Sequence, residues 1–87
     1  MALIDDLAEA LADDTLLAMD NLSNDRLYLE VAKAIGALSP SLQEAFLTAC
    51  RLRLAEQRGR RFLEATLRAA ETGTAAPVAP PEPESGL

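Results

Sequence analysis

The sequence predicts an all-α protein: a small three-helix bundle with a long third helix (about 40–71) and a disordered Pro-rich C-terminal tail. Aromatic residues make up 3% of the chain and apolar residues 49%, most of them alanine and leucine, which favours helix over sheet. Apolar residues also recur at three- and four-residue intervals through the first 38 residues. The pair Ser39-Pro40 then supplies a helix start, a capping side chain followed by a residue without an N–H.

The first helix is expected over about residues 2–20. Leu16 and Leu17 lie off its main apolar face, and Asp14 could cap a new helix start, so a break near residue 14 stays open. When residues are placed at 100° intervals, one face collects most of the large apolar side chains and is expected to contact the core. This face comprises Leu3, Ile4, Leu7, Leu11, Ala18, Met19 and Leu22.

The second helix is expected over about residues 24–38, after a short polar stretch rich in turn-forming and capping residues. Gly36 lies near its end, where glycine is tolerated and helps to terminate a helix. Its apolar face follows the three- and four-residue spacing of an amphipathic helix. The residues on this face are Leu27, Tyr28, Val31, Ala34, Ile35 and Leu38.

The third helix is expected to begin at Pro40 and to continue for about 48 Å at 1.5 Å per residue. Gly59 costs about 1 kcal/mol relative to alanine, which is too little to end the helix by itself. Apolar residues surround the first half, so we expect this half to lie between the other two helices. The second half carries a narrower stripe that includes Leu63 and Leu67, with Phe62 beside it, and these side chains are expected to remain partly uncovered.

Residues 1–72 are therefore expected to form one helical domain, and residues 73–87 a disordered Pro/Ala-rich tail that holds four of the five prolines. Within the 87 residues there is no histidine, and Cys50 is the sole cysteine. An intrachain disulfide is excluded and a zinc site lacks its usual ligands. Since so short a chain buries limited surface, we expect a partner chain to add stability.

The net charge of −6 disfavours nonspecific attraction to nucleic acids or anionic membranes. The N-terminal stretch is acidic, unlike a secretory signal, and no apolar run approaches the length of a membrane span. We therefore expect a cytoplasmic protein with no membrane contact.

One short segment resembles a DNA-binding helix-turn-helix in its spacing. Ala32, Gly36 and Leu42 stand at the intervals typical of that motif, within residues 31–46. The helix that would read DNA offers Gln43 and Thr48 but no basic residue before Arg51, although phosphate contacts usually dominate such interfaces. An ordinary helical hairpin is the preferred interpretation.

The charges are distributed unevenly along the chain. Residues 51–68 contain six of the seven arginines and have a local net charge of +4, whereas residues 1–25 contain seven acidic side chains and no basic one. Such an arginine-rich helix could bind a nucleic-acid backbone, a protein partner or a second copy of the chain, or could simply be solvated, with pairs such as Glu64 to Arg60 and Arg68.

No catalytic constellation is recognisable. The acidic clusters lack a histidine partner, Cys50 is expected to be a buried apolar residue, and no phosphate-binding or dinucleotide motif occurs. We expect no enzymatic activity, no cofactor, no metal and no small-molecule substrate.

The sequence thus predicts a non-catalytic protein-protein interaction or assembly module, such as a regulatory or accessory subunit, that binds another protein or forms an antiparallel homodimer. The alternative is a small nucleic-acid-binding regulator that uses residues 51–68 or a degenerate helix-turn-helix at 31–46. The expected partner-binding residues are Arg58, Arg60, Arg61, Phe62, Leu63 and Leu67.

Overall fold

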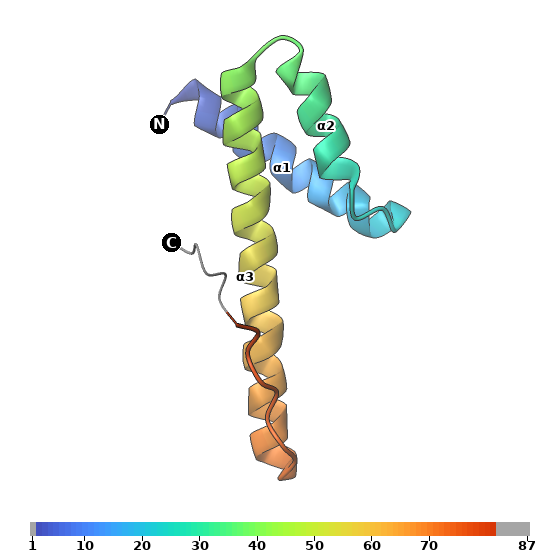
Figure 1. Ribbon diagram of the computed structural model, residues 1–87, viewed down its shortest axis with the longest axis vertical. Coiled ribbons are helices and arrows are strands. Elements are labelled where there is room, and N and C mark those ends of the chain that lie inside the picture. Colours follow the sequence, from blue (N-terminus) through green and yellow to red (C-terminus); the bar gives the residue numbers. More distant parts are fainter. Residues whose placement is uncertain (1, 82–87) are drawn as a thin grey trace. The chain divides into compact units, whose positions relative to one another are not determined.

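The computed structural model describes residues 2–81 and contains three helices, α1 (Leu3–Leu22), α2 (Leu27–Gly36) and α3 (Pro40–Thr72) (Figure 1). No strand occurs within residues 2–81, and residues 74–81 have no regular secondary structure. The predicted all-α fold with a long third helix is confirmed. The chain divides into two compact units, Met1–Leu54 and Ala55–Leu87, and α3 contributes to both. The rest of the predicted tail, residues 82–87, lies outside the described residues.

α1 is continuous through Asp14, so the break that the sequence left open does not occur. The helix ends where Ser23 adopts a left-handed conformation (φ 52°) and the N–H of Asn24 donates to the carbonyl of Met19 at 3.1 Å. α2 is shorter than predicted at both ends. Asn24 accepts a hydrogen bond from the N–H of Arg26 through its side chain, at 3.1 Å, which holds these residues in a turn instead of a helix.

α3 begins as the sequence predicts and runs without interruption through Gly59. The hydroxyl of Ser39 accepts a hydrogen bond from the N–H of Leu42 at 3.1 Å, so it caps one of the free amides at the helix start. Gly73 follows the last residue of the helix with φ +74°, a left-handed conformation that glycine adopts without a steric penalty.

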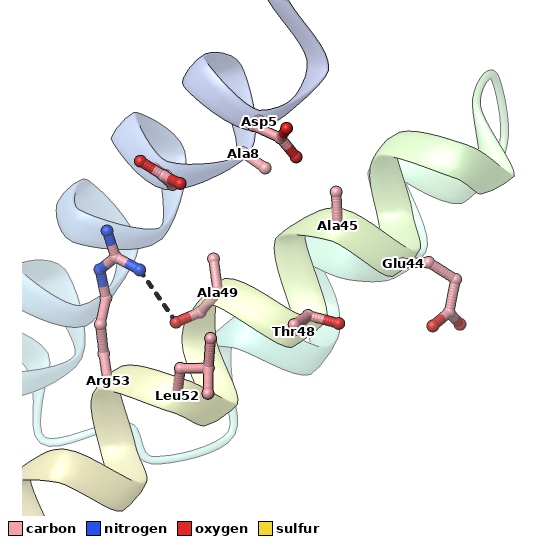
Figure 2. A pocket seen from close by; sticks show the side chains of 9 residues that line it. Asp5, Ala8, Glu44, Ala45, Thr48, Ala49, Leu52 and Arg53 are labelled. Atoms are coloured by element: carbon pink, nitrogen blue, oxygen red, sulfur yellow. Dashed lines mark hydrogen bonds between the residues drawn. The ribbon is translucent and has the colours of Figure 1, made fainter. Parts of the chain in front are cut away.

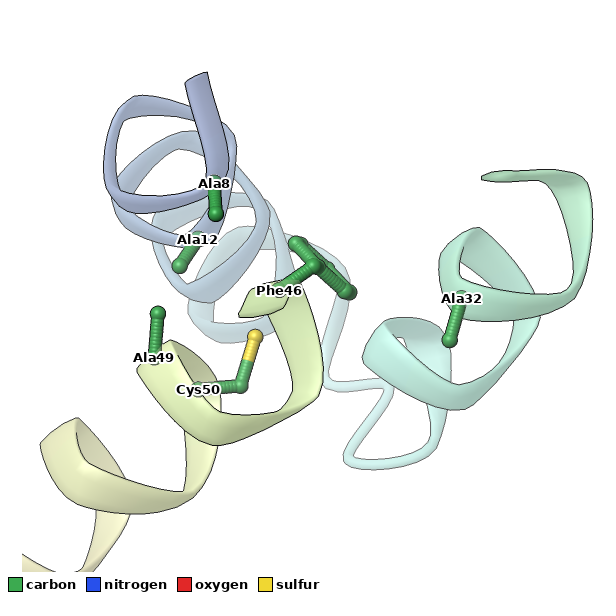
Figure 3. Packing of buried hydrophobic residues seen from close by; sticks show 6 residues of the cluster. All are labelled: Ala8, Ala12, Ala32, Phe46, Ala49 and Cys50. Atoms are coloured by element: carbon green, nitrogen blue, oxygen red, sulfur yellow. The ribbon is translucent and has the colours of Figure 1, made fainter. Parts of the chain in front are cut away.

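The core of the first unit is built mainly from small side chains. Alanines of α1 meet the first half of α3, and Phe46 extends from α3 between α1 and α2 (Figure 3). Phe46 and Cys50 are the largest side chains that are fully buried. The first half of α3 packs against both other helices, as predicted, but it does not separate them, because α1 and α2 also contact each other. The buried cluster consists of Ala8, Ala12, Ala32, Phe46, Ala49 and Cys50.

The predicted core face of α1 is wrong by part of a turn. Leu3, Leu7 and Leu22 are 71%, 50% and 67% exposed, while the buried residues are Ala8, Ala12, Thr15, Leu16 and Met19. Alanines on α1 and α3 allow close approach of the two backbones, and large leucines at this contact would hold the helices apart. Two residues of the predicted α2 face are also misplaced. Leu38 is 94% exposed and lies beyond the end of α2, and Ala34 is exposed while Ala32 is buried.

Gly36 has a role that the sequence did not reveal. The side-chain amide of Gln43 donates to the carbonyl of Ala32 at 2.9 Å and so ties the start of α3 to α2. A Cβ atom at Gly36 would lie 2.6 Å from Nε2 of Gln43. The glycine therefore leaves room for this amide to reach its acceptor.

Gly36→Ala should consequently have different effects in two backgrounds. In the natural chain the new methyl group displaces the Gln43 amide, and losing that hydrogen bond costs about 1 kcal/mol, which offsets the helix-propensity gain of up to about 1 kcal/mol. In Gln43→Ala the gain should be measurable as increased stability. Denaturant unfolding of the two single variants and the double variant measures the coupling; strictly additive effects would contradict the contact.

Candidate functional site

The predicted partner-binding residues all lie on α3 within the second unit and all are exposed. The apolar side chains retain much of their surface, with Phe62 36%, Leu63 53% and Leu67 55% exposed. Exposed large apolar side chains beside arginines have the composition typical of protein interfaces. Charge and apolar surface are thus combined on one helix.

The helix does not gather these six residues on a single face. Arg60, Leu63 and Leu67 follow the spacing i, i+3, i+7 and share one side, which we call the leucine face. Arg58 and Phe62 lie on the other side of α3. Each of the two sides could contact a different surface.

The second side also carries Arg61, Ala65 and Arg68, and we call this set with Arg58 and Phe62 the cationic face. Sequence reasoning missed Arg68 as a member, although its spacing of seven residues from Arg61 could have revealed it. Ala65 is half-buried, and Ala69, one turn further, is the one buried residue among the described residues of this unit.

Arg60 differs from the other arginines because it forms an ion pair within α3. Its Nη2 lies 2.6 Å from Oε2 of Glu56, and Nε donates to the same oxygen at 2.9 Å. This hydrogen bond raises the pKa of Arg60. The predicted pairs of Glu64 with Arg60 and Arg68 are not among the ion pairs of residues 2–81. Arg58, Arg61 and Arg68 form no ion pair within the described part of the chain and remain available to a partner.

A groove of about 370 Å³ lies between α1 and the first half of α3, entirely within the first unit (Figure 2). We call it the α1–α3 groove. Three alanines line it from both helices, and three carboxylates accompany them, two from α1 and one from α3. These residues are Ala8, Ala45, Ala49, Asp5, Glu9 and Glu44.

Arg53, at one end of the groove, already forms an ion pair and a hydrogen bond within the first unit. Its Nε donates to Oδ1 of Asp13 at 2.6 Å and its Nη1 donates to the carbonyl of Ala49 at 3.1 Å. The hydrogen bond with Asp13 is the main cause that raises the pKa of Arg53. The three carboxylates of the groove form no ion pair within residues 2–81, although the charge of Glu9 also helps to raise the pKa of Arg53.

The geometry gives little support to DNA reading by the start of α3 or to a reactive thiol at Cys50. Gln43, the main polar residue of the supposed DNA-reading helix, is bound to the carbonyl of Ala32. Cys50 is fully buried, and this burial raises the pKa of its thiol despite the opposing effects of Arg53 and Arg51. Within residues 2–81, no three acidic or sulfur side chains converge where a metal ion could bind.

Comparison with known proteins gives no relative: no family model, curated protein or solved structure matches this chain. Among the described residues, no helix combines the length and the apolar character needed to cross a membrane. The interpretation of the candidate site therefore rests on the geometry of this chain alone.

The Cys50 thiol should be unreactive until the protein unfolds. We expect a disulfide reagent to modify it at least about tenfold more slowly in the native protein than in denaturant, because reaction needs an exposed thiolate. As the pH rises past the ordinary thiol pKa of 9.0, the unfolded chain loses this proton before the folded chain does. Stability should then fall, as unfolding curves below and above that pH can measure. A native thiol that reacts as fast as the denatured one would contradict its burial.

The exposed apolar residues of α3 should contribute little to folding. The double change Leu63→Gln and Leu67→Gln should alter the free energy of unfolding by no more than about 1 kcal/mol, because more than half of the surface of each residue is exposed to solvent. Denaturant unfolding measures this, with Phe46→Ala as the buried reference, for which about 3–5 kcal/mol is expected. A comparable loss in both variants would show that the α3 residues support the fold.

Proposed function

We propose that the protein is a non-catalytic protein-protein interaction or assembly module that binds its partner through the second half of α3. The observation that supports this most directly is the exposure of Phe62, Leu63 and Leu67 next to arginines on a continuous helix. Burial of these apolar side chains against a partner would supply affinity, since removing apolar surface from water is favourable. The arginines would orient an acidic surface and accelerate its association.

Arginine suits this role better than lysine does. Its planar guanidinium forms paired hydrogen bonds with carboxylates and is weakly hydrated, so its transfer into an interface is less costly. The arginine side chains named above also carry long apolar stems that can cover neighbouring apolar surface. A regulatory or accessory subunit with this kind of surface needs no catalytic group of its own.

Reversing the charge of the surface should abolish partner binding. In affinity capture from the native host, the full chain should retain a partner that the variant Arg58→Glu, Arg60→Glu and Arg61→Glu loses, because Glu would repel an acidic partner. The variant Arg26→Glu and Lys33→Glu, which changes exposed basic residues outside this surface, serves as the control.

Capture unaffected by the triple change would overturn the proposal. The nucleic-acid alternative is tested with the same proteins and a labelled duplex or single-stranded RNA. Binding that collapses between low and moderate salt, and that the triple change also removes, would favour that alternative.

A further inference from the structure

One side of the second half of α3 is partly covered. Ala69 is 6% exposed, Ala65 and Thr66 are half-buried, and Phe62, at 36%, is the least exposed of the large apolar residues in this half. These four residues follow the spacing i, i+3, i+4 and i+7, so they form a continuous stripe on one side of the helix. Leu67, on the opposite side, is 55% exposed. Burial that is confined to one side indicates a second segment of chain along this stripe.

The segment that follows α3 is placed to cover the stripe. Gly73 ends the helix with φ +74°, and the N–H of Thr74 donates to the carbonyl of Ala69 at 3.0 Å. From there residues 74–81, which we call the strap, turn back toward the middle of α3 (Figure 1). Gly73 and the strap are the described residues of the second unit outside α3. Within this unit, the cover of the stripe therefore comes from the strap.

We propose that the stripe is a docking site for an extended proline-rich segment, that the strap is its resident occupant, and that a partner reaches the stripe by displacing the strap. This inference rests on the proposed function, because Phe62 belongs both to the stripe and to the expected partner surface. Leu63 and Leu67 remain more than half exposed, so a partner can make its first contact on the leucine face while the strap is in place. Strap and partner then compete for Phe62 and its neighbours.

The composition of the strap suits an occupant of this stripe. Its sequence, TAAPVAPP, contains three prolines, and its other residues are small or of moderate size. Proline holds φ near the value of the extended polyproline conformation, so the strap loses less conformational entropy on docking than a freely flexible segment would. At about 3.1 Å per residue an extended segment of this length spans about 25 Å. This exceeds the roughly 10 Å from Phe62 to Ala69 along the helix, at 1.5 Å per residue.

The charges beside the stripe indicate how a partner could prevail over the strap. Arg58 and Arg61 lie next to Phe62 on the cationic face and form no ion pair within residues 2–81. The strap carries no charged side chain. A partner segment that is extended and proline-rich like the strap, but that also carries carboxylates, would add paired hydrogen bonds with these guanidinium groups.

A spin label on the strap tests where it lies. Val78 is 90% exposed, so Val78→Cys can carry a nitroxide without disturbing the contact, while the buried Cys50 should stay unmodified, as the natural chain treated with the same label checks. The methyl signals of Ala65 and Ala69 should lose more NMR intensity than those of Leu67, because the label then lies on one side of a helix about 10 Å across. Equal losses on both sides would overturn the inference.

Competition is tested with a fluorescent peptide that has the sequence of the strap. The test variant is the full-length chain in which residues 74–81 are replaced by the same number of alternating glycine and serine residues. By fluorescence anisotropy it should bind the peptide about tenfold more tightly than the natural chain does, since a strap that is docked about nine-tenths of the time leaves about one-tenth of the molecules competent.

Two further variants serve as controls for the peptide assay. Val78→Ser changes an exposed side chain of the strap and should bind the peptide as weakly as the natural chain. Ala65→Arg, added to the test variant, places a large side chain on the stripe and should abolish peptide binding. Equal binding by the natural chain and the test variant, no binding to either, or binding that survives Ala65→Arg would overturn the inference.

The two proposals fail separately. Partner capture that depends on the α3 arginines, together with equal peptide binding by the natural chain and the test variant, overturns only the strap as competitor. Peptide binding as expected, together with capture that survives the charge reversal of the arginines, overturns only the proposed partner surface.

Discussion

The contact between α1 and the first half of α3 is made largely through alanine side chains. The small size of these residues determines which larger side chains are exposed to solvent. Ala8 and Ala12 of α1 and Ala49 of α3 are almost completely buried, with Phe46 beside them. Small residues on both helices permit close backbone approach and dense packing. The same close approach leaves no room at this contact for Leu3, Leu7 and Leu22, which face solvent, while Leu16 is buried.

The sequence predicted the helices well because their signals are local. Ser39 and Pro40 set the start of α3, and the spacing of apolar residues indicated each helix without knowledge of its neighbours. The buried face of α1 could not be predicted in the same way. Periodicity favours the side with the greatest apolar bulk, whereas the structure buries the side whose small residues fit α3. Which of two adjacent faces is buried depends on the partner helix, and a single-sequence pattern contains no information about that partner.

In the candidate site, too, features set by local sequence could be predicted, and features that depend on a neighbouring helix could not. Exposure of Phe62, Leu63 and Leu67 followed from the narrowness of the apolar stripe, and the structure agrees. The separation into a leucine face and a cationic face also follows from helical spacing, although composition alone suggested one mixed surface. The α1–α3 groove was beyond prediction, since it requires the relative position of Glu9 and Glu44, which are distant in the chain.

Assembly and stability are connected in a chain of this size. Phe46 and Cys50 are the largest fully buried side chains, so the first unit gains limited free energy from burial, while a small domain must still offset the conformational entropy of every ordered residue. Anything that binds only the folded state adds stability by mass action. A contact that covers apolar side chains and neutralises the separated charges of α1 and α3 would therefore stabilise the fold while it performs the function. On this proposal, the arginines and exposed apolar residues of α3 are the groups that a partner would cover, while the alanine contact between α1 and α3 keeps the three helices together without them.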